Sequence, residues 1–181
     1  GSEINALTLG GVGSGTTLEY IQALYGNDDS FEFFGGTVNA KHLISYATAD
    51  DDFDFDLGYT GRIQFGVVLR DPQWVDSGDA GNGVESDNNA SGTTATPLTR
   101  PVLSNFTFIG PNNAANTAAN HNFANRLRRN TRIVLNNSVL IGWQKGGLSL
   151  ESNGTYEDFV AANSSSEFKN NLIHAITAPF K

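Results

Sequence analysis

The 181-residue chain contains no cysteine, no methionine and no long run of apolar residues. The absence of cysteine excludes disulfide bonds, metal sites built on thiolates and thiol nucleophiles. The absence of methionine, in a chain with 12 phenylalanines, favours a core of regular layers of rigid side chains. Because a membrane-spanning helix needs about 18 or more consecutive apolar residues, the sequence predicts no such helix.

Basic residues are also scarce, with 11 lysines and arginines against 19 aspartates and glutamates, which gives a net charge of −8. Proteins that bind nucleic-acid duplexes neutralise the phosphates with clustered lysines and arginines. The one basic cluster in this sequence is Arg126, Arg128, Arg129 and Arg132. We therefore expect that neither a nucleic acid nor an anionic membrane surface is a partner.

The chain does contain a repeat. Residues 27–36 return in similar form at residues 49–58, so that Phe31 and Phe53 are 22 residues apart. In both copies apolar and acidic residues alternate, which is typical of a β-strand with one buried face. A period in the twenties, with one such strand in every unit, indicates a solenoid of stacked strands. The sequence therefore predicts a ladder of phenylalanines inside the stack and a ladder of carboxylates outside it.

Two classes of strand recur along the chain. The first class comprises residues 7–9, 31–33, 53–55, 84–86 and 148–150, with a further coil expected around Phe123. The second class comprises residues 17–25, 38–46, 63–70, 102–109 and 134–141. The longer connections, residues 71–99 and 111–122, are expected to be loops that protrude from one side of the stack.

The C-terminal part has a different pattern, and we expect a helical cap over residues 154–178. Acidic residues follow Thr155, as in the first turn of many helices, and Phe168, Leu172 and Ile176 recur at helical spacing. A helical cover would protect the last coil, because open strand edges recruit other strands.

The N-terminal side shows no equivalent cover, because residues 4–13 already have the pattern of a coil. The first two residues are typical of a remnant of a cloning vector. We therefore expect residues 1–181 to form a single β-helix domain of a longer protein. We also expect the N-terminal coil to self-associate, because nothing before it covers Leu7 and Leu9.

The coil pattern resembles the right-handed parallel β-helices of the pectate-lyase-like superfold. The segments that carry the resemblance are residues 7–13, 28–36, 50–58 and 62–72, which are similar to parts of large secreted or lipid-anchored bacterial surface proteins of uncertain function. Together with the repeat, the resemblance implies an all-β fold, a right-handed parallel β-helix of about five coils with a C-terminal helical cover. It also implies an extracellular or bacterial cell-surface location. It implies no single activity, because one scaffold carries lyases, hydrolases, adhesins and stalks.

The predicted outer ladder of carboxylates is the strongest candidate site. Neighbouring strands lie about 4.8 Å apart, which would place Asp54 between Glu32 and Glu85. Like charges at this spacing raise carboxyl pKa values or recruit a cation, and Ca²⁺ takes about six to eight oxygen ligands. We therefore expect a Ca²⁺ site made by Glu32, Asp52, Asp54 and Asp56. The alternative is a solvated acidic face.

Catalysis by the same region is a weaker prediction, with Asp52, Asp54 and Arg70 as candidates. In the lyases that the fold resembles, Ca²⁺ acts with a lysine or arginine base, and Arg70 is one available cation. A glycoside hydrolase would need two carboxyl groups about 5 to 10 Å apart, which Asp51, Asp52 and Asp54 could supply. However, the Gly-His-Gly and Arg-x-Lys signatures of β-helix hydrolases are absent.

Candidate ligand-binding residues are Trp74, Tyr59 and Asp87, since exposed aromatic rings beside polar groups can hold a sugar. These residues favour a non-catalytic module that binds a polysaccharide or a surface protein, or that has a structural role. The alternative is a polysaccharide lyase or glycoside hydrolase that acts through residues 50–56 with Ca²⁺.

Overall fold

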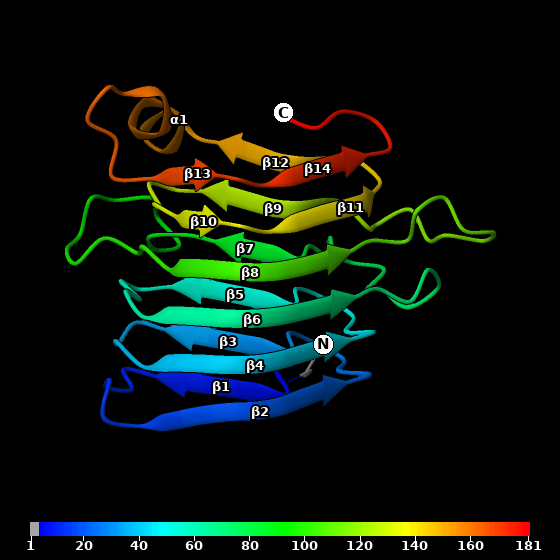
Figure 1. Cartoon of the computed structure of the whole chain (residues 1–181), viewed down its shortest axis with the longest axis horizontal. Coiled ribbons are helices and arrows are strands. Elements are labelled where there is room, and N and C mark those ends of the chain that lie inside the picture. The colour runs from blue at the N-terminus through cyan, green and yellow to red at the C-terminus, as the bar shows by residue number, and fades with distance from the viewer. Residues whose placement is uncertain (1–3) are drawn as a thin grey trace.

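The structure, a computed structural model, describes residues 4–181 and arranges them as two facing layers of stacked parallel strands (Figure 1). The expected cloning remnant at residues 1–2 lies outside the described residues. The chain passes from one layer to the other and back in every coil, so each coil adds one level to both layers. Among residues 4–181, no helix is long and apolar enough to cross a membrane.

One layer, here called sheet A, has the strand order β1-β3-β5-β7-β9-β12. Its strands are β1 (Leu7–Gly10), β3 (Phe31–Phe34), β5 (Phe53–Asp56), β7 (Val84–Ser86), β9 (Phe123–Arg128) and β12 (Gly146–Glu151). The other layer, sheet B, contains β2 (Thr17–Leu24), β4 (Asn39–Tyr46), β6 (Arg62–Leu69), β8 (Val102–Ile109), β10 (Val134–Asn136), β11 (Val139–Trp143), β13 (Glu167–Lys169) and β14 (Leu172–Ala175). Both β10 and β11 pair with β8, so they form one level, and β13 with β14 form the next. The stack therefore has six coils, where the repeats predicted about five.

The predicted phase of the repeat is confirmed. Phe31 pairs in register with Phe53, and Phe33 pairs with Phe55. The two rings of each pair stack with their centroids 5.0 Å and 5.2 Å apart, and all four side chains are fully buried. Because side chains alternate along a strand, the acidic residues between the rings project outward. Together with the parallel pairing of both sheets, this confirms the predicted β-helix fold.

The core changes character along the stack. In register with Phe53, the next strands place first Val84 and then Asn125 inside. Beside them lies Ser86, whose hydroxyl group is 2.6 Å from that of Thr131. On sheet A the inward residues are therefore aromatic in β3 and β5 and smaller or partly polar in β7 and β9, whereas the buried rings of the C-terminal coils, Phe106, Phe108 and Trp143, come from sheet B.

The C-terminal segment corrects the prediction of a helical cap over residues 154–178. Only α1 (Asn153–Val160) is helical, and the second half of the predicted cap forms β13 and β14. Phe168 and Ile173 pack against the core from these strands. The spacing of the apolar residues fits a helix, but the open edges of β10 and β11 offer backbone partners along the whole segment, and this pairing overrides the local pattern. The last coil is covered by α1, which contacts β12, and by the chain end, where Phe180 pairs with Leu148.

The long loops protrude from two opposite sides, and not from one side as predicted. Strand β7 divides residues 71–99 into two loops. The loop before β7 leads from sheet B to sheet A, as does the loop at residues 110–122, whereas the loop after β7 leads from sheet A to sheet B (Figure 1). Connections of the two kinds lie on opposite edges of a two-layer coil.

Candidate functional site

The outward face of sheet A carries two rows of mainly charged side chains. As predicted, Asp54 lies in register between Glu32 and Glu85. The charge of this row changes sign at the next strand, where Arg126 pairs in register with Glu85. The second row contains Asp56, Asp87, Arg128 and Glu151. The face is therefore acidic only over the N-terminal coils.

Over the C-terminal coils, arginines form ion pairs with the carboxylates of sheet A. We call the residues of these ion pairs the paired face: Glu85, Asp87, Arg126, Arg128, Arg129 and Glu151. The guanidinium of Arg128 donates to both carboxylate oxygens of Asp87, at 3.0 and 2.8 Å, and also to Glu85. Arg126 bridges Glu85, at 3.3 Å, and Glu151, at 3.0 Å. Burial alone would lower the pKa of Arg128, but its bonds to Asp87 and its attraction to Glu85 raise that pKa overall.

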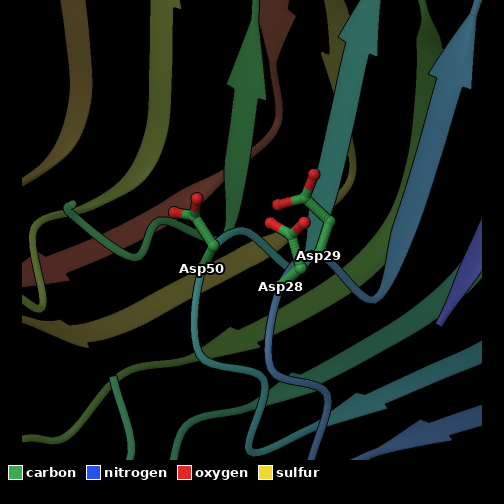
Figure 2. A group of neighbouring side chains, drawn as sticks. All are labelled: Asp28, Asp29 and Asp50. Atoms are coloured by element: carbon green, nitrogen blue, oxygen red, sulfur yellow. The ribbon is translucent and has the colours of Figure 1, made fainter. Parts of the chain in front are cut away.

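Over the N-terminal coils five carboxylates converge, and we call them the acidic cluster: Asp28, Asp29, Glu32, Asp50 and Asp54. Carboxylate oxygens of Asp29, Glu32 and Asp54 lie within 4.8 Å of one another, and so do those of Asp28, Asp29 and Asp50. Figure 2 shows the second group, in which adjacent turns of the chain bring the three carboxylates to the same side. Asp29 belongs to both groups and is the centre of the cluster.

The environment of the acidic cluster opposes ionisation. Burial, with the repulsion of Asp50 added to it, raises the pKa of Asp29 to about 9. Burial likewise raises the pKa values of Glu32 and Asp50 to about 7 and holds the pKa of Asp54 well above its usual value. Within residues 4–181, no lysine or arginine forms an ion pair with Asp29, Glu32 or Asp54. Asp29, Glu32 and Asp54 are therefore close neighbours without an ion-paired lysine or arginine among the described residues.

A ladder of side chains explains why carboxyl groups are buried here. The side-chain oxygen of Asn5 accepts the backbone N–H of Asp29, Asp29 accepts that of Asp51, and Asp51 accepts that of Asn82, at 3.2, 2.9 and 2.6 Å. Asn82 in turn accepts the N–H of Phe123 at 3.2 Å. Each side chain thus satisfies a donor in the next coil. Asn5 and Asn82 play the same structural role as Asp29 and Asp51, and an amide fills this role without a buried charge.

A family model described as a pectate-lyase like beta helix domain matches residues 1–180. The chain belongs to this family. No curated protein and no solved structure gives a significant match to the chain. Since this scaffold carries many activities, membership identifies the fold, and the activity must be argued from the side chains of this pectate-lyase-like β-helix domain.

Two of the candidate catalytic residues lie in the interior of the β-helix domain. Asp52 and Arg70 form an ion pair at 3.2 Å, and both side chains are fully buried. Ser45 also donates to Asp52, and a second bond joins Arg70 to the backbone oxygen of Asp50 at 2.7 Å. Asp52 is therefore not part of the acidic cluster, and neither residue can contact a polymer on the surface.

The candidate ligand-binding residues are dispersed. Tyr59 is fully buried, where its ring stacks on Phe55 and its hydroxyl donates to the backbone oxygen of Val38 at 2.8 Å. Asp87 is held in the paired face. Trp74 alone is accessible, with 37% of its surface exposed and its indole N–H donating to the backbone oxygen of Gly26 at 3.1 Å.

Of the four predicted metal ligands, the structure brings Glu32 and Asp54 together. Asp56 lies in the second row, where it accepts the backbone N–H of Leu57 at 2.6 Å. Sequence reasoning missed the central Asp29, although the 22-residue repeat aligns it with Asp51. It also missed that the arginines of the paired face share this surface, although Arg126 and Arg128 alternate with the apolar Leu127.

Proposed function

We propose that the protein is a non-catalytic, extracellular or cell-surface binding module whose acidic cluster binds Ca²⁺ and whose ligand is a polysaccharide or a surface protein. One observation carries this proposal: arginines pair with the carboxylates of sheet A over the C-terminal coils, whereas no lysine or arginine within residues 4–181 pairs with Asp29, Glu32 or Asp54. A cation from solution would supply the balance that the side chains do not.

The acidic cluster suits Ca²⁺ in its chemistry. Ca²⁺ prefers carboxylate oxygens and accepts about six to eight of them in flexible geometry. Five carboxylates supply enough oxygens, because a carboxylate can bind through one oxygen or through two. Bound Ca²⁺ would also lower the pKa values of Asp29 and Asp54, since an opposite charge favours the ionised form. Ca²⁺ would tie together adjacent coils of the stack.

The arrangement of basic residues argues against a lyase. A lyase needs a base that gives up its own proton before it takes one from the substrate. Arg126 and Arg128 lie near the acidic cluster, but their ion pairs raise their pKa values and keep them protonated. Arg70 is fully buried and cannot reach a polysaccharide.

A glycoside hydrolase is the second candidate. Its mechanism needs one protonated and one ionised carboxyl group about 5 to 10 Å apart. The raised pKa values of Glu32 and Asp54 are of the kind that a general acid needs. The absence of the hydrolase signatures places this candidate second.

Calorimetric titration with CaCl₂ tests the first part of the proposal. We expect heat of binding at pH 7.5 that is lost in the double variant Asp29→Asn/Asp54→Asn. It should persist in Glu151→Gln, a matched control from the paired face. Absence of both heat and a shift in melting temperature at millimolar Ca²⁺ would contradict the metal site.

Assays of polysaccharide cleavage test the second part. We expect neither release of reducing ends nor formation of unsaturated products with uncharged or uronate polymers, with or without Ca²⁺. Cleavage that disappears in Asp54→Asn and persists in Glu151→Gln would establish the second candidate instead.

A further inference from the structure

Sheet B bends at one residue in every coil, and this residue has a positive φ each time. The six residues are Tyr20, His42, Phe65, Asn105, Asn137 and Asn170, with φ between 54° and 63°. This left-handed conformation is most accessible to glycine and asparagine and is uncommon for bulky residues. The register of β6 with β8 puts Phe65, and not its neighbour Gly66, at the third of these positions.

The N-terminal and C-terminal coils use different side chains at this bend. The last three coils have asparagine, which suits the conformation. The first three have aromatic rings, and Tyr20 and Phe65 leave 76% and 42% of their surfaces exposed. Since asparagine makes the same bend, the fold does not require aromatic residues. Their presence costs conformational energy and exposes apolar surface, which points to recognition.

The three rings line a groove on the outer surface of sheet B. The ring of His42 is parallel to those of Tyr20 and Phe65, with centroids 4.5 Å and 5.1 Å away. The groove has a volume of about 520 Å³ and extends over four strands, from β2 to β8. Its opposite side is formed by Gln22, Ile44, Val67 and Thr107. It therefore runs along the axis of the stack, across the strands.

The lining of the groove defines the chemistry of its occupant. Among the described residues that line it, none is aspartate, glutamate, lysine or arginine. Ile44 and Val67 offer exposed apolar surface, while Gln22, Asn105 and Thr107 offer neutral hydrogen-bonding groups. The lining repeats at the strand spacing of about 4.8 Å, so a polymer of repeating units can make similar contacts in successive coils.

We propose that this groove binds a neutral, linear polysaccharide that lies along the axis of the stack. A pyranose chain has apolar C–H faces, which pack against Ile44, Val67 and the aromatic rings, and hydroxyl edges, which bond the neutral polar groups. Polyuronates are disfavoured, because the groove offers no cation and the protein carries a net charge of −8. This inference rests on the proposed binding function and names the class of its ligand.

The test replaces aromatic residues at the bend with asparagine, the residue that the C-terminal coils have there. The double variant Tyr20→Asn/Phe65→Asn should fold, with a melting temperature equal to or above that of the native chain. Affinity electrophoresis would measure binding to xyloglucan, galactomannan, hydroxyethyl cellulose and polygalacturonate. We expect the native chain to be retarded by at least one uncharged polymer and not by polygalacturonate. The double variant should lose at least tenfold in affinity, and Tyr156→Asn, an exposed tyrosine on α1, should lose none.

Each other outcome overturns the groove assignment. Binding that survives in the folded double variant would place the glycan elsewhere and leave the proposed function intact. Retardation only by polygalacturonate would show that the ligand is anionic. Failure to bind any polymer would remove the polysaccharide ligand, and the Ca²⁺ titration would then test the proposed function separately. A dimer that the double variant dissociates would show that the groove is an interface between copies.

Discussion

The three N-terminal coils and the three C-terminal coils share one backbone plan and differ in side chains both inside and outside. Inside, stacked rings such as Phe31 and Phe53 give way to Ser86 and Asn125. Outside, the acidic cluster gives way to the ion pairs of the paired face. At the bend of sheet B, aromatic residues give way to asparagine.

This difference shows that strand pairing determines the backbone path of each coil, while the side chains vary with the role of each region. Burial of the stacked phenylalanines supplies much of the stability of the N-terminal coils. That stability offsets the cost of burying carboxyl groups without cations. In the C-terminal coils the buried rings belong to sheet B, at Phe106, Phe108 and Trp143, and the charges outside sheet A are paired.

The largest expected effect is in the aromatic core. Phe53→Ala should lower the free energy of unfolding by about 3 to 5 kcal/mol, because it leaves a cavity between Phe31 and Val84. Val84→Ala, in the next coil, removes less buried surface and should cost about 2 kcal/mol. Urea denaturation measures both. Equal losses would mean that the stacked ring of Phe53 contributes no more to stability than the smaller side chain of Val84.

The next effect is in the paired face. Arg128→Ala should lower the free energy of unfolding by about 2 to 3 kcal/mol, because it leaves Glu85 and Asp87 partly buried without their main cation. Arg129→Ala is the matched control: Arg129 also contacts Asp87, at 2.5 Å, but is far more exposed, and its loss should cost about 0 to 1 kcal/mol. If the two variants are equally stable, the paired face contributes little.

An ion-paired carboxylate makes a folded chain more stable as the pH rises. The acidic cluster should have the opposite effect on the free energy of unfolding of this chain. Burial raises the pKa of Asp29 from its usual value of 3.8 to about 9, so the folded chain binds more protons than the unfolded chain between these values. Without Ca²⁺, the free energy of unfolding should therefore fall as the pH rises from 5 to 9, with a slope of up to about 1.4 kcal/mol per pH unit for this one carboxyl group. Thermal melts across this range measure the slope.

Two changes should flatten that slope. Asp29→Asn replaces the carboxyl group by the amide that Asn5 and Asn82 already provide in the same ladder, and it should stabilise the chain at pH 8. Added Ca²⁺ should act in the same direction on the native chain. A slope of unchanged size in Asp29→Asn would show that Asp29 ionises freely.

The smallest expected effect concerns the ends of the stack. β1 and β2 are the outermost strands of their sheets, and Leu7 and Leu9 are only half-buried, whereas α1 covers the other end. We expect weak self-association through the N-terminal coil, seen as a mass that rises with concentration in sedimentation equilibrium. Leu7→Lys should abolish it, and Leu172→Lys, at the other end, should not. A monomer at all concentrations would refute the expectation.

The sequence by itself determined the coil and its phase. Alternation around Phe31 and Phe53 is a local property, and the 22-residue spacing of these two repeats places Asp54 beside Glu32. The same spacing aligns Asp29 with Asp51, so the repeat itself carries the signal for the central carboxylate of the cluster.

Only the tertiary structure decided which distant groups meet. Arg128 and Glu85 are 43 residues apart and are separated by loops of irregular length, so no period relates them. Tyr59 is an aromatic residue of the kind that can bind a sugar, but it lies in the core because the turn before β6 directs its side chain inward. Residues 167–175 have helical spacing and form strands, because the open edges of β10 and β11 supply backbone partners. Local periodicity encodes which face a side chain takes, while charge pairing, burial and edge pairing depend on neighbours that the chain acquires only when it is stacked.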